Sequence, residues 1–312
     1  MTRPCDVVIT VDVGGSGVKL AAYSIASHRS LGHYMVPWPT TSWSAEGSEF
    51  DAACWWAAAE AALAGCVSSL DLPARVYAGI TVGAIRIPFV LIDDRGDPVG
   101  PCISNGDRRA VAEAAELGRM FGASVLYETT GHWPAAEFGL PKLLWLRRHR
   151  PELLARTRHL LQLHDWFILR LSGQVLSELS SAAMSQLVAV NVDRWADDLL
   201  RSLGMPIGWF PELCPAGTIA GGLCPEVAGK VGLPGGLPVF LGGGDTQLSA
   251  LGAGAVVARP PVVIVAGTTV PIQLACPDDV VAGQHSGHTL LRSRHLIREW
   301  PSAGQAEADP GR

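Results

Sequence analysis

Charged residues are scarce in this 312-residue chain, and its cysteines are scattered. Asp, Glu, Lys and Arg make up 17% of the residues, whereas hydrophobic residues make up 48%. The seven cysteines include no C-x-x-C pair, which argues against a zinc cluster and against a disulfide framework. A chain of this apolar content buries a large core, and its length fits two domains, so a disordered protein and a single small module are excluded.

An excess of positive charge is also missing. Lys and Arg total 24 against 29 Asp and Glu, a net charge of -5, whereas nucleic acids and anionic membranes attract basic proteins. Asp6 stands where a signal peptide would have its apolar stretch, and we identify no apolar run elsewhere that is long enough to span a bilayer. The sequence therefore predicts a cytoplasmic protein that binds neither nucleic acid nor membranes.

Strand and helix patterns alternate along the chain and predict an α/β fold. Apolar runs at 7–11 and 18–23 flank a glycine-rich bend and predict a hairpin. Further predicted elements are strands at 76–82 and 239–241, a hairpin at 89–99, and helices at 51–69, 107–119, 137–149, 151–161, 165–173, 195–204, 225–231 and 246–255. The Pro-Gly cluster at 233–238 predicts a domain boundary, and a hairpin at 262–274 repeats the plan of the first.

A carboxylate stands at the end of the first apolar strand. Asp12 precedes the sequence Gly-Gly-Ser-Gly at 14–17, and a basic side chain, backbone N–H groups or a cation must compensate its charge there. Two interpretations stay open. Asp12 forms an Asx-type turn, or the glycines let backbone amides approach a phosphate while Asp12 holds a hydrated magnesium ion. Lys19 lies on the returning strand, so the segment is not a P-loop.

A second carboxylate follows three glycines. Asp245 comes after Gly-Gly-Gly at 242–244 and opens a predicted helix. It either only caps the helix or serves as a general base, since a positive helix terminus keeps a carboxylate ionised and glycines leave room for a substrate. The bend of the last hairpin carries Gly267, Thr268 and Thr269. Two matching hairpins are what a phosphate cleft between two similar domains requires.

Together these segments resemble the FGGY carbohydrate kinases of the actin-like ATPase superfamily. The motifs that carry the resemblance are Asp-Val-Gly-Gly-Ser-Gly at 12–17, Gly-Gly-Asp-Thr-Gln at 243–247, Ala-Gly-Thr-Thr at 266–269, and segments similar to D-x-R-A at 107–110, K-L-x-W at 142–145 and D-x-L-x-x-x-L-T-G at 165–173. The resemblance covers about 7–274. It implies a ribonuclease-H-like (actin-like ATPase) fold with a complete first domain and the start of a second.

The resemblance also implies a function. It implies a kinase, a transferase of carbohydrate metabolism that uses ATP and Mg²⁺ to phosphorylate a sugar or polyol hydroxyl. Asp245 would be the general base and Asp12 the magnesium residue. The other implied residues are Gly14, Gly15, Ser16, Lys19, Gly267, Thr268 and Thr269 for the nucleotide phosphates, and Arg86, Asp107, Thr246 and Gln247 for the sugar.

Two features depart from the family pattern. Ile87 follows Arg86 where these kinases often carry His or Glu facing the substrate, so the sugar pocket is atypical. The family continues past the second phosphate hairpin with segments that hold adenosine. We therefore expect residues 1–238 to form the N-terminal domain and 239–312 a partial C-terminal domain without its adenosine part. A fragment, a frameshifted product and a retained remnant all stay open.

Two other functions stay open. Repressor-type sugar kinases share the Asp-x-Gly-Gly start, but their cysteine-rich zinc segment is missing from this sequence. A non-catalytic sugar-binding or partner-binding remnant fits the missing adenosine part and would bind without turnover. The expected partners are a small sugar or polyol and either a second copy or a chain that completes the second domain.

Overall fold

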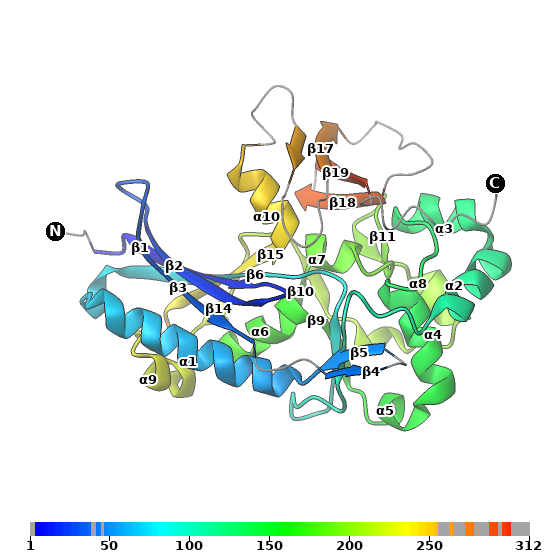
Figure 1. Cartoon of the computed structure of the whole chain (residues 1–312), viewed down its shortest axis with the longest axis horizontal. Coiled ribbons are helices and arrows are strands. Elements are labelled where there is room, and N and C mark those ends of the chain that lie inside the picture. Colours follow the sequence, from blue (N-terminus) through cyan, green and yellow to red (C-terminus); the bar gives the residue numbers. More distant parts are fainter. Residues whose placement is uncertain are drawn as a thin grey trace.

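A mixed sheet of six strands forms the centre of the fold (Figure 1). The computed structural model describes residues 4–38, 42–44, 47–254, 262–264, 272–277, 287–292 and 295–300. Across the sheet the strands are β14 (Ile219–Gly222), β15 (Pro238–Gly244), β6 (Tyr77–Ala84), β1 (Val7–Val13), β2 (Gly17–Ser24) and β3 (Arg29–Pro37). The first predicted hairpin is confirmed as β1–β2. Because β15, β6 and β1 run parallel, their carboxyl ends meet at one edge.

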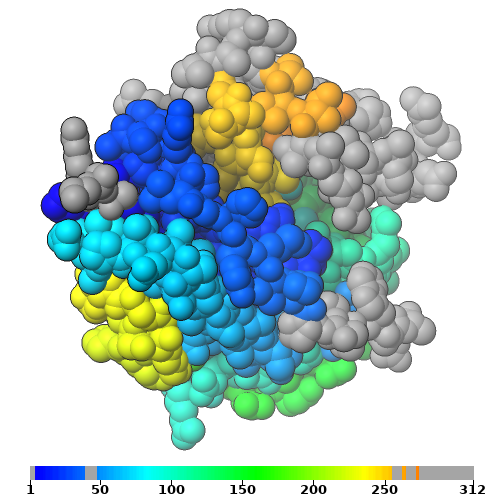
Figure 2. Space-filling view, turned by 60° about the vertical axis from the view of Figure 1, so that its left-hand side comes forward, coloured from blue at the N-terminus to red at the C-terminus, as the bar shows by residue number. Residues whose placement is uncertain are grey.

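Helix α1 (Ala52–Leu70) confirms the helix predicted at 51–69 and packs against β2, β3 and helix α9 (Pro225–Val231) (Figure 2). The Asp51 carboxylate caps it by accepting the backbone N–H groups two and three residues later, at 2.8 and 3.2 Å. Its side chains Trp55, Trp56 and Leu63 are buried in the main core. The helix therefore covers one face of the strands that lead to the sheet edge.

Length and composition alone would allow α1 to cross a membrane. The prediction that the chain has no such apolar run is therefore wrong for this segment. In the structure one side of α1 is buried in the core, and its Glu60 forms an ion pair with Lys230 of α9 at 3.5 Å. These contacts are those of a core helix, which can be as long and as apolar as a helix that crosses a membrane.

Residues 89–210 supply a second core, made mostly of helices and drawn to the right of the sheet in Figure 1. Leucines of α4 (Gly139–His149) and α8 (Asp197–Ser202) meet the strand pair β7 (Phe89–Ile92) and β9 (His159–Gln162) there. Helix α6 (Leu163–Ser172) links the two cores, because it contacts β6 and β15 as well as β9. It ends as predicted at Gly173, whose φ of 74° suits a glycine C-cap.

Three predictions in this second part need correction. The helix predicted at 151–161 is only α5 (Pro151–Ala155), because the residues that follow pair with β7 as β9. The helix predicted from 107 begins later, as α2 (Val111–Leu117). The second strand of the 89–99 hairpin is reduced to a single bridge between Ile92 and Pro98. The other elements of the chain are β4 (Ser42–Ser44), β5 (Gly47–Phe50), β8 (Cys102–Ile103), β10 (Leu176–Glu178), β11 (Val188–Ala189), β12 (Arg194–Trp195), β13 (Glu212–Cys214), α3 (Ala123–Thr130), α7 (Leu179–Ala183), the 3-10 helices η1 (Ala74–Val76) and η3 (Ile207–Trp209), and the π-helix η2 (Gly118–Gly122).

Helix α10 (Asp245–Gly252) follows β15, and a second, antiparallel sheet comes after it. Across this second sheet the strands are β16 (Val262–Ile264), β17 (Ile272–Pro277), β19 (His295–Trp300) and β18 (Gly287–Arg292). The antiparallel strand pairing predicted for 262–274 is confirmed as β16–β17, with Val262 opposite Leu274. The bend between these strands lies outside the described residues. Because β15 pairs within the first sheet, residues on both sides of the boundary expected at 238 share that sheet.

Candidate functional site

Three parallel strands bring the candidate residues to one edge of the sheet. In the strand register, Asp12 of β1 lies opposite Gly83 of β6, and Gly83 lies opposite Gly243 of β15. Neighbouring strands are about 4.8 Å apart. The Asp12 backbone and the glycines before Asp245 are therefore separated by roughly 10 Å, two strand spacings.

Lys19 compensates the charge of Asp12. Its Nζ lies 3.2 Å from Oδ2 of Asp12, across the β1–β2 hairpin. Both side chains are about half exposed, at 52% and 42%, and an ion pair so exposed is worth only about 0–1 kcal/mol. The pair is therefore held loosely enough to exchange one partner for a phosphate or a cation.

The bend between β1 and β2 is closed by backbone contacts and is open on one side. Gly14 N donates to Gly17 O at 3.1 Å. A Cβ on Gly17 would overlap the carbonyl of Val36, so only glycine fits there. A Cβ on Gly15, in contrast, would meet nothing within 4 Å. Packing requires the first of these glycines, whereas the second faces space that a ligand can enter, beside the exposed Ser16.

Asp245 begins α10 and lies beside Arg86. The Nε of Arg86 is 3.4 Å from Oδ1 of Asp245, which also accepts the backbone N–H of Thr246 at 2.8 Å. A Cβ on Gly244 would overlap Oε1 of Gln247 and would lie 2.7 Å from Cδ of Arg86. The structure thus brings together four of the predicted residues around Gly244, a glycine that has no space for a side chain. They are the predicted base, Asp245, and three predicted substrate contacts, Arg86, Thr246 and Gln247.

The chain direction after Arg86 is strained. Ile87 has φ of 84°, a conformation that a β-branched residue adopts only when its surroundings enforce it, at a cost of about 1–3 kcal/mol. The sequence singled out Ile87 for its side chain. The structure adds that its backbone lies in the left-handed region, in the bend that follows β6.

A buried polar network holds the glycines before Asp245, and the sequence analysis missed it. Gly242 N donates to Nε2 of His164 at 3.3 Å, and Nδ1 of His164 lies 2.8 Å from Oδ1 of Asp165. Because Nε2 accepts, the histidine proton is on Nδ1 and is donated to Asp165. Gly244 N donates to Oγ of Ser180 at 3.2 Å. These two chains of hydrogen bonds, one through His164 and one through Ser180, are here called relays. Both fix the backbone that leads into Asp245.

Each relay ends on a buried carboxylate. Oγ of Ser180 donates to Oε2 of Glu178 at 2.7 Å, and Glu178 N in turn donates to Asp165 at 2.9 Å. Burial raises the pKa of Glu178, although the hydroxyl and backbone N–H of Ser180 oppose that effect. The local sequence signal for this network was weak, namely a His-Asp pair directly after an apolar strand.

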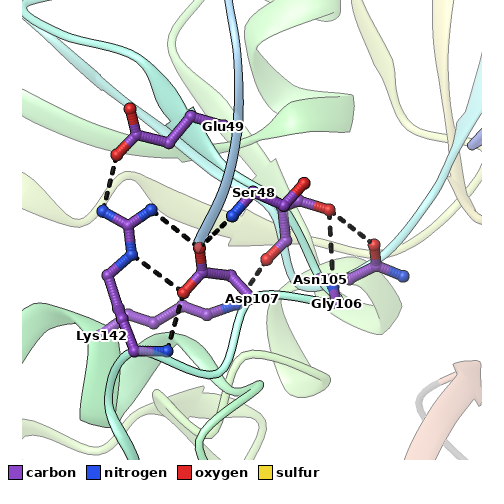
Figure 3. Close-up of polar contacts among 8 residues, drawn as sticks. Ser48, Glu49, Asn105, Gly106, Asp107 and Lys142 are labelled. Carbon is purple, nitrogen blue, oxygen red and sulfur yellow. Dashed lines mark hydrogen bonds and ion pairs between the residues drawn. The ribbon is translucent and has the colours of Figure 1, made fainter. Parts of the chain in front are cut away.

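Asp107 lies in a separate polar cluster (Figure 3). Its buried carboxylate accepts Ser48 N at 2.6 Å and the Nε and Nη2 of Arg109 at 2.9 and 2.8 Å. Arg109 also pairs with Glu49 at 2.6 Å. Burial opposes ionisation of Asp107, but the hydrogen bonds from Arg109 and Ser48 outweigh it and lower its pKa. These contacts join β5 to the loop before α2, and the predicted sugar contact of Asp107 stays a prediction.

Lys142 of α4 is fully buried beside Asp107. Its Nζ donates to Ser104 O at 2.7 Å. Burial lowers the pKa of Lys142 to about 8, against the opposing effect of the Asp107 carboxylate. Lys142 therefore links α4 to the same loop through a group that titrates close to neutral pH.

Replacing Lys142 with Met should remove a rise of stability with pH. In the unfolded chain the lysine titrates near its ordinary pKa of about 10.4. Between about pH 8 and 10 the unfolded state of the wild type therefore binds more protons than the folded state, and its free energy of unfolding rises by up to about 1.4 kcal/mol per pH unit. Urea unfolding at pH 7 and 10 should show the wild type gaining stability relative to Lys142→Met. Lys230→Met removes a lysine whose side chain is half exposed and is the control. An equal response of both variants would contradict the assignment of the pH effect to Lys142.

The remaining predicted residues, Gly267, Thr268 and Thr269, lie outside the described residues. Within the described part of the chain, no group of three or more His, Cys, Asp or Glu could hold a metal ion. Magnesium, however, is usually bound by one or two carboxylates together with water and substrate phosphates. Asp12, half exposed beside the open bend, fits that form of binding.

Comparison with known proteins gives consistent matches. The sequence model of the FGGY family of carbohydrate kinases, N-terminal domain, matches residues 7–252. Autoinducer-2 kinase of Salmonella typhimurium is 31% identical over 224 residues, which is 71% of this chain and 42% of that protein. Autoinducer-2 kinase of Yersinia enterocolitica is 28% identical over 265 residues, 82% of this chain and 49% of that protein. This chain thus spans less than half the length of these relatives.

A solved structure shares the fold over nearly the whole chain. Xylulose kinase from Rhodospirillum rubrum matches with a TM-score of 0.86 and 24% identity, over 96% of this chain and 62% of that protein. The region matched by the family model contains Asp12, Lys19, Arg86 and Asp245, the residues that the strand ends bring together.

Proposed function

This chain belongs to the FGGY family of carbohydrate kinases, and on that premise we propose that it acts in the ATP-dependent phosphorylation of a sugar or polyol hydroxyl. The observation that carries the proposal is the arrangement at the sheet edge. Asp245, a carboxylate at the start of a helix, lies beside Arg86. A second carboxylate, Asp12, lies two strands away, where it pairs with Lys19 next to the open glycine bend.

In the proposed reaction Asp245 accepts the proton of the substrate hydroxyl, whose oxygen bonds to the γ-phosphorus of ATP as the bond to ADP breaks. Arg86 holds the Asp245 carboxylate in place. Lys19 and the Gly15 N–H receive phosphate oxygens. Magnesium bound at Asp12 would neutralise part of the phosphate charge. Arg86, Thr246, Gln247 and Asp107 are the proposed contacts of the substrate's hydroxyls.

We further propose that the first domain extends to the end of α10 and that the residues after it begin the second. Support comes from the pairing of β15 with β6 and from the family model, which reaches residue 252. Gly267, Thr268 and Thr269 would form the second phosphate loop. Any second copy or completing chain would bind on the side of that later segment.

Calorimetry and an ADP-release assay test the proposal. Autoinducer-2, xylulose and glycerol are the first ligands to titrate, with and without ATP and magnesium. Binding of one of them together with ADP release supports the kinase, whereas binding without turnover supports the non-catalytic alternative. The absence of binding to all three and to MgATP would contradict the proposal for this chain.

Replacing Asp12 with Asn should weaken the response to magnesium. The amide keeps the size of the side chain but loses the charge that would hold the cation. We expect the magnesium concentration that gives half-maximal ATP binding to rise about tenfold, equivalent to about 1.4 kcal/mol, while sugar affinity stays unchanged. Asp94→Asn, at an 89% exposed side chain, is the control. An unchanged magnesium requirement in Asp12→Asn would place the cation elsewhere.

A further inference from the structure

Trp38 contacts both ends of the glycine bend between β1 and β2. Its indole Nε1–H donates to Gly14 O at 2.7 Å, and its backbone N–H donates to Ser16 O at 3.3 Å. The tryptophan lies just after β3, the strand that pairs with β2. One residue thus fixes two carbonyl groups of the proposed phosphate loop.

The ring of Trp38 is itself held by helix α1. It stacks on Trp55 with the ring centroids 4.3 Å apart and the planes 9° apart, and Trp55 stacks on Phe50 at 3.8 Å and 16°. Trp55 and Phe50 are buried, and Trp38 is half-buried. The indole N–H is therefore aimed at Gly14 by a stack of three rings that rests on the start of a core helix.

This contact determines where the next amide points. In a planar trans peptide the C=O of Gly14 and the N–H of Gly15 point in opposite directions. Because the carbonyl faces Trp38, the N–H of Gly15 faces away from it. Gly15 is exposed, and the space where its Cβ would stand is open. On the neighbouring Gly14, a Cβ would lie 3.6 Å from Nζ of Lys19.

We propose that Trp38 is a positioning residue that orients the Gly14–Gly15 peptide so that its N–H, together with Lys19, receives a phosphate oxygen. The inference rests on the proposed function, since it concerns the phosphate side of the same site. Trp38 touches no reacting atom. It acts through the backbone of Gly14, whose carbonyl accepts the indole hydrogen bond.

Two variants separate this role from simple packing. Trp38→Phe keeps a ring on Trp55 but removes the N–H donor. Trp195→Phe is a matched control, because the Trp195 Nε1 also donates to a backbone carbonyl, that of Pro211, at 2.6 Å, and its ring also contacts an aromatic neighbour, Phe210. Each variant loses one indole hydrogen bond, so their free energies of unfolding should fall alike.

The measurements are amide NMR of the ¹⁵N-labelled chain and calorimetry with MgATP and with inorganic phosphate. We expect Trp38→Phe, but not Trp195→Phe, to move the Gly15 amide resonance and to weaken MgATP binding about three- to tenfold, the equivalent of one hydrogen bond. An unmoved Gly15 resonance or wild-type affinity in Trp38→Phe would overturn the proposal. If the wild type binds neither MgATP nor phosphate, the proposed function fails for this chain, and the Gly15 resonance alone decides the role of Trp38.

Discussion

Asp245→Asn should lower the rate of sugar phosphorylation by about 10²–10⁴-fold, the usual contribution of a positioned general base. The amide keeps the shape of the carboxylate and can still hydrogen-bond a hydroxyl, so sugar affinity should change little. Arg86 loses its ionic partner at 3.4 Å, but Gly244 N keeps its hydrogen bond to Ser180, and the amide oxygen of asparagine can still accept the N–H of Thr246. The assayed protein is this chain fused to the C-terminal part of Salmonella autoinducer-2 kinase, the part that follows the matched region. The measurement is a coupled ADP-release assay in which sugar and magnesium are titrated separately.

The control for this prediction is another aspartate at a helix start. Asp197 is the first residue of α8 and lies 3.8 Å from Arg201. Asp197→Asn removes a carboxylate from a positive helix terminus, worth about 0.3–1 kcal/mol of stability, and should leave turnover unchanged. Near-normal turnover in Asp245→Asn would mean that Asp245 only stabilises its helix, as Asp197 does.

Local sequence was sufficient for the elements and residues whose roles depend on near neighbours. The helix at 51–69 follows from an N-cap aspartate and an alanine-rich run, and the helix at 225–231 was predicted with the bounds that α9 has. Asp12 and Asp245 were found because each stands next to glycines at the end of an apolar strand. The actin-like ATPase fold expected from these motifs is confirmed by the likeness to sugar-kinase structures.

Contacts between residues far apart in the sequence were not predicted. His164 meets Gly242 across 78 residues, and Trp38 meets Gly14 across 24. Neither pair leaves a periodic pattern in the chain. The same cause explains the wrong helix at 151–161, since β9 exists only through its pairing with β7. Asp107 was singled out through a local motif, but its hydrogen bond with Ser48 joins residues 59 positions apart.

Asp165→Ala should lower the free energy of unfolding by about 3–5 kcal/mol, because it removes the shared acceptor of a buried hydrogen-bond network. The fully buried carboxylate accepts hydrogen bonds from Gln162 N, Glu178 N and the hydroxyl of Ser177, and pairs with His164. Alanine leaves these donors without their acceptor in a site that is closed to water, and each unsatisfied buried donor costs about 1–3 kcal/mol. Urea unfolding measures the loss.

The same substitution should also loosen the catalytic segment before the protein unfolds. Without Asp165, His164 loses the partner that keeps the proton on Nδ1 and leaves Nε2 free to accept Gly242 N. Amide hydrogen exchange at Gly242 should therefore accelerate more than exchange in α9, which lies outside this network. Asp94→Ala, where the carboxylate is 89% exposed and pairs with Arg158 at 3.7 Å, should change stability by no more than about 0.5 kcal/mol. A loss below about 1 kcal/mol in Asp165→Ala would lie within the net value of a single hydrogen bond. It would show that water or a neighbouring group replaces the carboxylate. The network would then not be what holds the glycines before Asp245.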